Sequence, residues 1–373
     1  MQILLINRFF WPDEHGTARH ATDLAEDLVA AGHAVTVAAS NTAGGDPGRF
    51  FPPRDSHRGI AIHRVGTARF DRQRLMGWAL NALSFYPGAL WRILRLPRHG
   101  VTLIMSDPPM IFALGPLVRW MKRTRFVYWS MDLYPDVAVE AGVLRRGSLV
   151  ARFFEAVSRW ALRRADRVIA IGEVMRERLL AKGVAPERVV VCHNWTDPER
   201  VRPVPNAENT FAREHGLAGR FVVLYAGNMG LSHEFATMLE AARDLERSSD
   251  ALFLLIGGGK QTAGVRESAG QLGNVRMLPY QPEDRLAEAL SAAAVHVVTL
   301  KPGMEGTLLP SKLYSSLAAA RPVVFVGPEH SEPAQIVARG GCGIRVAPGD
   351  AAGFAAAVER LRGAEGRRMG EAG

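Results

Sequence analysis

Residues 221–258 read FVVLYAGNMGLSHEFATMLEAARDLERSSDALFLLIGG, and this stretch decides the fold. An apolar run at 221–227 leads through a glycine-containing turn into a helix-length segment at 234–245, and a second apolar run follows at 251–258. Short apolar strands that alternate with helices are typical of parallel sheets whose two faces are both covered. The stretch therefore predicts a strand–helix–strand unit with parallel strands.

The same alternation continues in both directions along the chain. The remaining apolar runs are QILLIN, AVTVAAS, IAIHRV, VTLIMS, RFVYWS, DRVIAI and RVVVCHN in the first half, and NVRML, AVHVVTL, PVVFVG and CGIRVAPGD in the second. A length of 373 residues suits two domains. Residues 194–209 are rich in proline and polar residues and follow neither period, which indicates a boundary there. We therefore predict two Rossmann-like, doubly wound α/β domains, 1–200 and 201–373, that face each other across a cleft at their strand ends.

The charge is distributed unevenly between these halves. Residues 1–200 hold 28 Lys and Arg against 19 Asp and Glu, whereas residues 201–373 hold 18 of each, so the whole excess of +9 lies in the first half. Residues 51–125 alone carry 13 basic and 3 acidic side chains. Such a basic segment predicts an anionic partner, which could be phosphate, nucleic acid or lipid headgroups.

The cysteines and the N-terminus favour a cytoplasmic protein. Only Cys192 and Cys342 are present, without CxxC spacing or clustered histidines, so neither a disulfide framework nor a zinc site is indicated. The first residues, MQILLINRFFWP, resemble a strand more than a secretion signal.

Residues 72–98, RQRLMGWALNALSFYPGALWRILRLPR, combine aromatic residues with basic ends. The 17 residues between Arg74 and Arg92 fall short of the ~20 needed to span a bilayer. The segment can instead lie in the headgroup region, where each basic side chain contributes about 1 kcal/mol. We interpret it as a membrane contact, with a core helix as the alternative. The membrane-contacting residues would be Trp78, Phe85, Trp91, Arg92 and Arg95.

Two loops of the first half carry candidate site residues. Gly16 lies between the first predicted strand and its helix, where a glycine lets backbone N–H groups approach a phosphate or sugar, although it can equally be a plain turn. Asp132 follows the strand RFVYWS and could bind or deprotonate an acceptor hydroxyl, or simply cap a helix. Asp132 and Asp136 without further ligands do not make a metal site.

Two glycine turns of the second half can admit a charged ligand. Gly227 and Asn228 follow the first strand of that half, and Gly258 precedes Lys260 after the next strand. LIGGGKQ is not a P-loop, because Leu254 occupies the position of its first glycine and a glutamine follows the lysine. No strand-to-helix turn carries GxGxxG, which argues against a dinucleotide-dependent oxidoreductase.

The stretch 300–322, LKPGMEGTLLPSKLYSSLAAARP, adds a lysine at a helix start. Glu305 and Gly306 are expected in a loop, and Ser311 and Lys312 in the first helical turn after a proline. A lysine there opposes the helix dipole, so it needs another reason to be present. Free N–H groups together with Lys312 could hold a diphosphate and stabilise its developing charge as it leaves.

Together these blocks resemble glycosyltransferase family 4, in particular bacterial transferases of O-antigen, capsule and exopolysaccharide assembly similar to fucosamine transferases. The blocks are FFWPDEHGTARHATDLAEDLVAAGHAVTV, MDLYPDVAVEAGVL, VVVCHNWTDPERVRP, YAGNMGLSHEF and LKPGMEGTLLPSKLYSSLAAARPVVF. The resemblance implies a GT-B fold and a retaining, metal-independent transfer that needs no cofactor. It also implies a nucleotide-sugar donor, UDP-linked by expectation, on the second domain, and a lipid-linked acceptor (a glycan on polyprenyl diphosphate) on the first.

Site roles follow from the resemblance position by position. It places Gly227, Asn228 and Lys312 at the donor diphosphate, Glu305 and Gly306 at its sugar, and Gly16 and Asp132 at the reacting centre. The chain departs from many relatives, which carry Arg and Lys where it has Asn228 and His233, and Glu where it has Thr307 and Ser315. It also ends before the helix with which relatives cross back onto the first domain.

Two other functions remain to be weighed. A nucleotide-sugar 2-epimerase or hydrolase of the same fold would not need a basic, aromatic membrane segment. A nucleic-acid-binding protein could use the basic first half, but no recognition motif is present. The sequence thus favours a peripheral enzyme on the inner face of the plasma membrane, with no nucleic acid among its partners.

Overall fold

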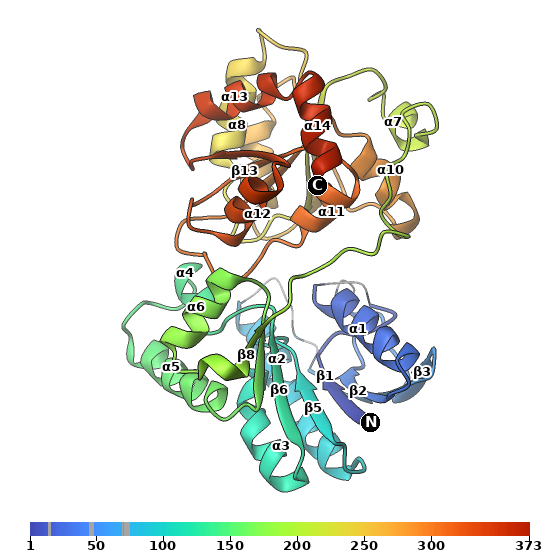
Figure 1. Cartoon of the computed structure of the whole chain (residues 1–373), viewed down its shortest axis with the longest axis vertical. Coiled ribbons are helices and arrows are strands. Elements are labelled where there is room, and N and C mark those ends of the chain that lie inside the picture. Colours follow the sequence, from blue (N-terminus) through green and yellow to red (C-terminus); the bar gives the residue numbers. More distant parts are fainter. Residues whose placement is uncertain (14–15, 45–47, 69, 71–74) are drawn as a thin grey trace. The chain divides into compact units, whose positions relative to one another are not determined.

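The computed structural model describes residues 1–373 apart from 14–15, 45–47, 69 and 71–74, and no side chain at 75, 76, 78 and 79. The chain forms two compact units, Met1–His193 and Asn194–Gly373. Each unit is built around its own sheet (Figure 1).

The sheet of the first unit has eight strands in the order β3-β4-β2-β1-β5-β6-β7-β8. Neighbouring strands are parallel except that β3 pairs antiparallel with β4. The strands are β1 (Gln2–Ile6), β2 (Ala34–Ser40), β3 (Arg54–His57), β4 (Ile60–Val65), β5 (Val101–Ile104), β6 (Arg125–Ser130), β7 (Arg167–Ala170) and β8 (Val189–Val191).

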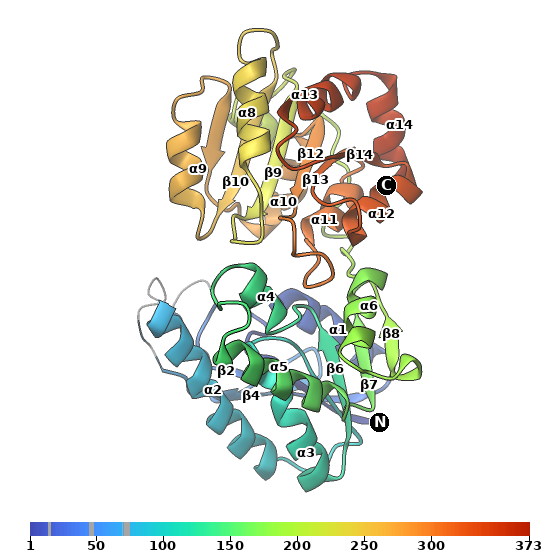
Figure 2. The same ribbon diagram turned by 90° about the vertical axis from the view of Figure 1, so that its left-hand side faces the viewer.

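Helices cover both faces of this sheet. In Figure 2, α2, α3 and α5 lie in front of the strands and α1 lies behind them. The helices are α1 (Ala18–Ala30), α2 (Leu75–Arg95), α3 (Gly115–Lys122), α4 (Asp136–Glu140), α5 (Leu149–Leu162) and α6 (Glu173–Ala181), with the short 3-10 helices η1 (Ile111–Leu114) and η2 (Pro186–Arg188).

The sheet of the second unit has six parallel strands in the order β11-β10-β9-β12-β13-β14. The strands are β9 (Val222–Asn228), β10 (Leu252–Gly258), β11 (Val275–Leu278), β12 (Val295–Thr299), β13 (Val323–Val326) and β14 (Gly343–Val346). The helices are α7 (Thr210–Glu214), α8 (Ala236–Leu245), α9 (Thr262–Ala269), η3 (Glu283–Arg285), α10 (Leu286–Ser291), α11 (Lys312–Ala318), α12 (Glu332–Gly340), α13 (Ala351–Arg360) and α14 (Ala364–Ala372).

The apolar runs of the sequence become strands because both faces of each sheet are covered. In β12 every residue from Val295 to Thr299 is buried. In the neighbouring strand β9, Val223 and Tyr225 belong to one hydrophobic cluster, and the alternate residues Val222 and Leu224 belong to another. The prediction of two doubly wound α/β domains is confirmed. Every predicted strand is present; β3 is the strand that the pattern missed, because RDSH has no apolar run.

Three smaller features bear on the predictions. Residues 364–372 form α14, whose Gly370 packs against the backbone at Ala320 within the second unit. Cys192 is exposed and Cys342 is buried, and both are free thiols. Of the helices in the described part of the chain, none has the length and apolar character to cross a bilayer.

Candidate active site

A lysine and a histidine meet at the strand ends of the second unit. The Nζ atom of Lys312, at the start of α11, lies 2.9 Å from Nε2 of His233 in the loop after β9. The Nδ1 atom of His233 lies 2.8 Å from the backbone oxygen of Thr299, at the end of β12. The Lys312 ammonium also lies 4.8 Å from the centre of the Tyr225 ring. Two side chains, those of His233 and Tyr225, therefore contact the ammonium, and the backbone of Thr299 holds His233 in place.

The hydrogen bonds settle the state of His233. A carbonyl oxygen only accepts, so Nδ1 carries the proton and Nε2 is left to accept from Lys312. Burial and then the charge of Lys312 hold the pKa of His233 well below its usual value, so the ring is neutral. Burial also lowers the pKa of Lys312 to about 7. An anion beside the ammonium would favour its charged form, as expected of a site for a phosphate group.

Glycines make room for this pair. Gly227 has a φ of +134°, and a Cβ atom there would lie 3.2 Å from Cε of Lys312. In the neighbouring strand β10, Gly257 has a φ of +133°, and a Cβ atom there would lie 2.1 Å from the backbone oxygen of Gly227. No other residue type fits at 257 without moving the backbone. The two strands can therefore end side by side, with the backbone of Gly227 next to the side chain of Lys312.

The second predicted turn extends the same edge. Gly258 of β10 lies opposite Asn228 of β9, another candidate from the sequence. The backbone oxygen of Gly258 accepts from the hydroxyl of Tyr280 at 3.1 Å. Asn228 is exposed at the end of β9, and Lys260 is exposed just before α9. The predicted donor-side residues of both glycine turns thus lie on one edge of the sheet.

The loop between β12 and α11 brings the remaining candidates of the second unit to this edge. The backbone N–H of Lys301 donates to the oxygen of Ser232 at 2.9 Å, which ties the loop to the segment that carries His233. Gly306 is buried with a φ of +67°, and Glu305 beside it is partly buried. Ser311 is the exposed residue that precedes α11, and its side chain makes no capping hydrogen bond.

In the first unit, Asp132 has the electrostatics of a proton acceptor. It lies just after β6, and its backbone N–H donates to the hydroxyl of Ser106 at 3.1 Å. Burial, and then the charge of Asp107, raise the pKa of Asp132 to about 7. A carboxyl that titrates near neutral pH can take a proton from a hydroxyl group under physiological conditions. Asp107 follows β5, the strand next to β6, so two adjacent strand ends form this feature.

Gly16 lies at another strand end of the same sheet. It precedes α1 with a φ of +60°, it is exposed, and there is open space where a Cβ atom would stand. The next residue, Thr17, exchanges hydrogen bonds with the side chain of Asn7 at the end of β1. The amide of Asn7 therefore fixes the turn that Gly16 begins.

The predicted membrane segment is α2 with its flanks, and its residues differ in outcome. Trp91 is half exposed, and the guanidinium of Arg95 stacks 3.8 Å from its ring centre. Arg92 is partly buried on the same turn. Phe85 is fully buried, so its assignment to a membrane contact is wrong: it packs beneath the helix in the core. The side chain of Trp78 lies outside the described residues.

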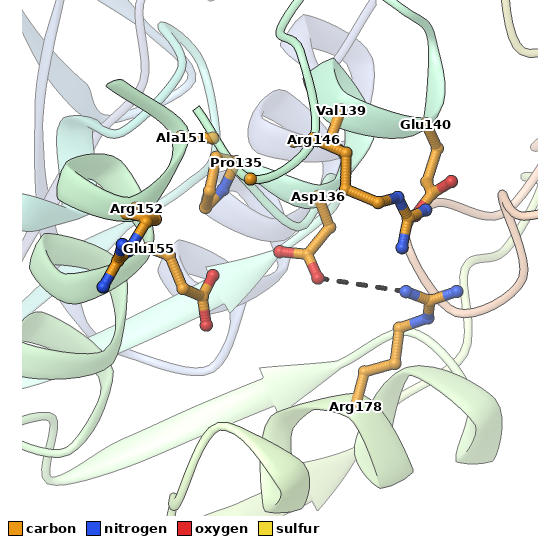
Figure 3. Close-up of a pocket in the computed structure, with 10 residues that line it drawn as sticks. Pro135, Asp136, Val139, Glu140, Arg146, Ala151, Arg152, Glu155 and Arg178 are labelled. Carbon is orange, nitrogen blue, oxygen red and sulfur yellow. Dashed lines mark hydrogen bonds and ion pairs between the residues drawn. The ribbon is translucent and has the colours of Figure 1, made fainter. Parts of the chain in front are cut away.

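A pocket of about 320 Å³, with several charged side chains in its lining, lies between α4, α5 and α6 (Figure 3). Its charges largely pair among themselves. Asp136 lies 3.8 Å from Arg178 and 2.7 Å from Lys182, which also contacts Glu155 at 2.5 Å. Asp136 therefore has a structural role, as a member of this ion-pair network. No predicted site residue lines the pocket, and the described residues contain no cluster of three or more His, Cys, Asp or Glu that could hold a metal.

Comparisons with known proteins fit this arrangement. Residues 15–195 match the family described as Glycosyl transferase 4-like domain, and residues 220–363 match Glycosyl transferases group 1. The chain belongs to glycosyltransferase family 4. This transferase is 29% identical over 269 residues to the probable glycosyltransferase WbjE of Pseudomonas aeruginosa, covering 72% of this chain and 67% of that protein. It is 26% identical to the putative colanic acid biosynthesis glycosyl transferase WcaI of Escherichia coli K12, over 90% of this chain and 86% of the relative.

Solved structures establish the fold of this glycosyltransferase as GT-B. Sucrose-phosphate synthase of Thermosynechococcus elongatus matches with a TM-score of 0.73 at 20% identity, over 100% of this chain and 92% of that one. Anabaena HepE in complex with UDP-glucose matches with a TM-score of 0.74 at 13% identity, over 100% and 93%. Identities this low carry the fold alone, and the predicted GT-B fold is confirmed.

Sequence reasoning missed three residues of the glycosyltransferase that the structure places at these edges. In the sequence, His233 stands out only because it differs from the family pattern at that position. The structure shows that its ring contacts the ammonium of Lys312. Asp107 gives a weak signal in the sequence, the SDPP that follows an apolar strand. Tyr280 is exposed beside Gly258, and its segment shows no motif.

Proposed function

We propose that this glycosyltransferase moves a sugar from a nucleotide-sugar to a glycan carried on a polyprenyl diphosphate, during synthesis of a bacterial surface polysaccharide. The observation that carries the donor half is the Lys312 ammonium, held by a neutral His233 beside the glycine-lined ends of β9 and β10. A leaving nucleoside diphosphate gains negative charge in the transition state, and a fixed cation stabilises that charge.

The donor is proposed to be UDP-linked, and the transfer to proceed with retention and without a metal ion. The UDP-glucose complex of HepE, which has the same fold, supports a UDP-sugar. In the second unit, Gly227, Asn228, Gly258 and Lys260 would surround the diphosphate together with Lys312, and the loop at 305–311 would contact the sugar. A cation supplied by the protein can take the role that a metal plays in other transferases.

The acceptor half rests on the first unit. Asp132 would accept the proton of the attacking hydroxyl, since its raised pKa lies near the working pH. Gly16 leaves open space at a neighbouring strand end for an acceptor group. The relative WcaI is named for colanic acid biosynthesis, and a solved structure of similar fold, WaaG, is described as a transferase of lipopolysaccharide biosynthesis. A lipid-linked acceptor also suits α2 as a contact with the inner face of the plasma membrane, where the cytoplasm supplies nucleotide-sugars.

The test is a thermal-shift screen against UDP-, GDP- and dTDP-sugars, followed by transfer assays with polyprenyl diphosphate glycans in the presence of EDTA. We expect one nucleotide class to raise the melting temperature, and the product to keep the anomeric configuration of the donor by NMR. A purified enzyme that neither binds nor hydrolyses nor transfers any activated sugar would refute the proposal. Loss of transfer with EDTA would refute metal independence alone.

A further inference from the structure

Exposed apolar side chains are concentrated in one of the two units. Among the residues that the structure describes, 17 large apolar side chains are exposed, and 16 of them belong to the first unit. Eleven of these lie on three helices, α2, α3 and α5. Single exposed apolar residues are ordinary on protein surfaces, but such a concentration usually marks an interaction surface.

Helix α5 shows the reverse of ordinary amphipathic packing. Its buried residues are mostly small: Ala151, Ser158 and Ala161, with Leu162 at the end. Its large apolar residues point outward, with 81% of Leu149, 63% of Phe153 and 53% of Val150 exposed. A surface helix normally turns its large apolar side chains toward the core. Core packing therefore does not explain why leucine, valine and phenylalanine occupy these positions.

Helix α3 continues this surface. Trp120 is 77% exposed, more than any other tryptophan in the described chain. Two basic residues of α3 join the helix to its neighbours. Arg119 pairs with Asp166, just beyond α5, at 2.9 Å, and Lys122 donates to the backbone oxygen of Leu96, just beyond α2, at 2.6 Å. Helices α2, α3 and α5 lie on the same side of the sheet (Figure 2), and we call their outer sides the helical face.

The charge of the helical face points to its partner. Helices α2, α3 and α5 together carry six basic residues, two on each helix, and one acidic residue, Glu155. On α2 the guanidinium of Arg95 lies over the ring of Trp91, so an aromatic ring and a positive charge are held together. Tryptophan with nearby arginine and lysine is the composition that settles at a membrane–water interface, where the anionic headgroups balance the positive charge.

We propose that the helical face docks on an anionic bilayer, with Trp120 of α3 and Leu149, Val150 and Phe153 of α5 inserted beside Trp91 of α2. This extends membrane contact well beyond the segment 72–98 that the sequence indicated. The choice of lipid as the partner rests on the proposed lipid-linked acceptor. The proposal also makes α5, not α2 alone, a determinant of how the enzyme reaches that acceptor.

The test is co-sedimentation of the full-length protein with vesicles of phosphatidylcholine, with and without phosphatidylglycerol. We expect binding only to the anionic vesicles, weakened by salt, and reduced at least ~10-fold in the double variant Leu149→Glu/Phe153→Glu, which places two like charges against the headgroups. Val190→Glu is the matched control, since Val190 is 47% exposed on β8 and lies outside the helical face. It should bind like the wild type.

Three readouts keep the outcome interpretable. Thermal unfolding shows whether the double variant is folded. If it is not, Trp120→Phe replaces it, and the readout is the quenching of tryptophan fluorescence by vesicles of brominated lipid. This quenching should be stronger in the wild type than in Trp120→Phe. Turnover with a water-soluble acceptor separates docking from catalysis: the folded double variant should keep this turnover and lose activity on an acceptor carried by vesicles.

Equal vesicle binding by wild type and double variant would overturn the proposal, as would sedimentation velocity showing that the variant only breaks a dimer. An enzyme that docks but transfers no sugar would refute the proposed function and leave the docking face standing.

Discussion

Replacing Lys312 by alanine removes the cation at the strand ends of the second unit while keeping the backbone. At an effective dielectric constant of 20, a unit charge about 4 Å from an anion interacts with about 4 kcal/mol. Removal of one preorganised charge-stabilising donor costs about 10²–10³-fold in kcat in other enzymes. We therefore expect Lys312→Ala to lower turnover at least ~100-fold. The measurement is kcat with a saturating nucleotide-sugar.

The control must separate charge from folding. Alanine at 312 also leaves Nε2 of His233 without its donor, an unsatisfied buried group that costs about 1–3 kcal/mol. Thermal unfolding of the variant is measured alongside, and kcat is compared below its melting temperature. Lys301→Ala is the control for charge. Lys301 lies in the loop that leads to the same helix, and the hydrogen bond to Nε2 of His233 comes from Lys312 and not from Lys301, so this variant removes an equal charge and should lower turnover far less. A folded Lys312→Ala enzyme that keeps more than about a tenth of wild-type turnover would refute the role of Lys312.

Four further expectations concern three residues. Because the pKa of Asp132 is raised to about 7, its deprotonation should give kcat/KM a rising acid limb near that value, while loss of the Lys312 proton near the same pH should lower kcat/KM on the alkaline side. Asp132→Asn should remove the acid limb along with most of the activity; a pH–rate profile unchanged by the substitution would contradict this. The same raised pKa means that the Asp132 carboxylate lowers stability as pH increases from about 4 to 7, so wild type should lose stability over this range relative to Asp132→Asn in urea titrations. Gly257→Ala places a Cβ atom against the oxygen of Gly227 and should lower the free energy of unfolding by more than about 2 kcal/mol, with an unshifted melting temperature as the contrary result. Lys182→Met leaves Glu155 without its cation and Asp136 with only the 3.8 Å contact to Arg178, and should cost about 3 kcal/mol in denaturant unfolding, most of it recovered when both carboxylates are also changed to amides; a stable single variant would count against the ion-pair network.

Much of the fold could be predicted because parallel strands buried on both faces leave continuous apolar runs in the sequence. Strand β3 escaped because it is an edge strand with alternating exposure and no apolar residue in RDSH. Phe85 was misassigned for a related reason. Nearly every position of α2 between 75 and 96 is apolar or small, so its composition could not tell which side faces the core, and only packing against the sheet showed that Phe85 is buried.

The candidate site divides in the same way. Lys312 could be picked out because a cation at a helix start opposes the helix dipole, which is a local property of the sequence. Its partner could not, because His233 lies 79 residues away and meets Lys312 only in the folded chain, where the backbone of Thr299 holds it. Asp132 was identified by its place after a strand, but its raised pKa comes from burial in the folded unit and then from the charge of Asp107, which follows another strand.

The Lys312–His233 pair also resolves the family departures at 228 and 233. Where relatives place an arginine and a lysine, this chain has an uncharged amide and a neutral imidazole, so the edge of the sheet holds fewer fixed positive charges. His233 accepts from Lys312, whose side chain passes beside Gly227. Since burial holds the pKa of Lys312 near 7, the free site carries a cation that the fold disfavours. A bound diphosphate would raise that pKa again, so an anion would stabilise the charged form of Lys312 and a neutral ligand would not.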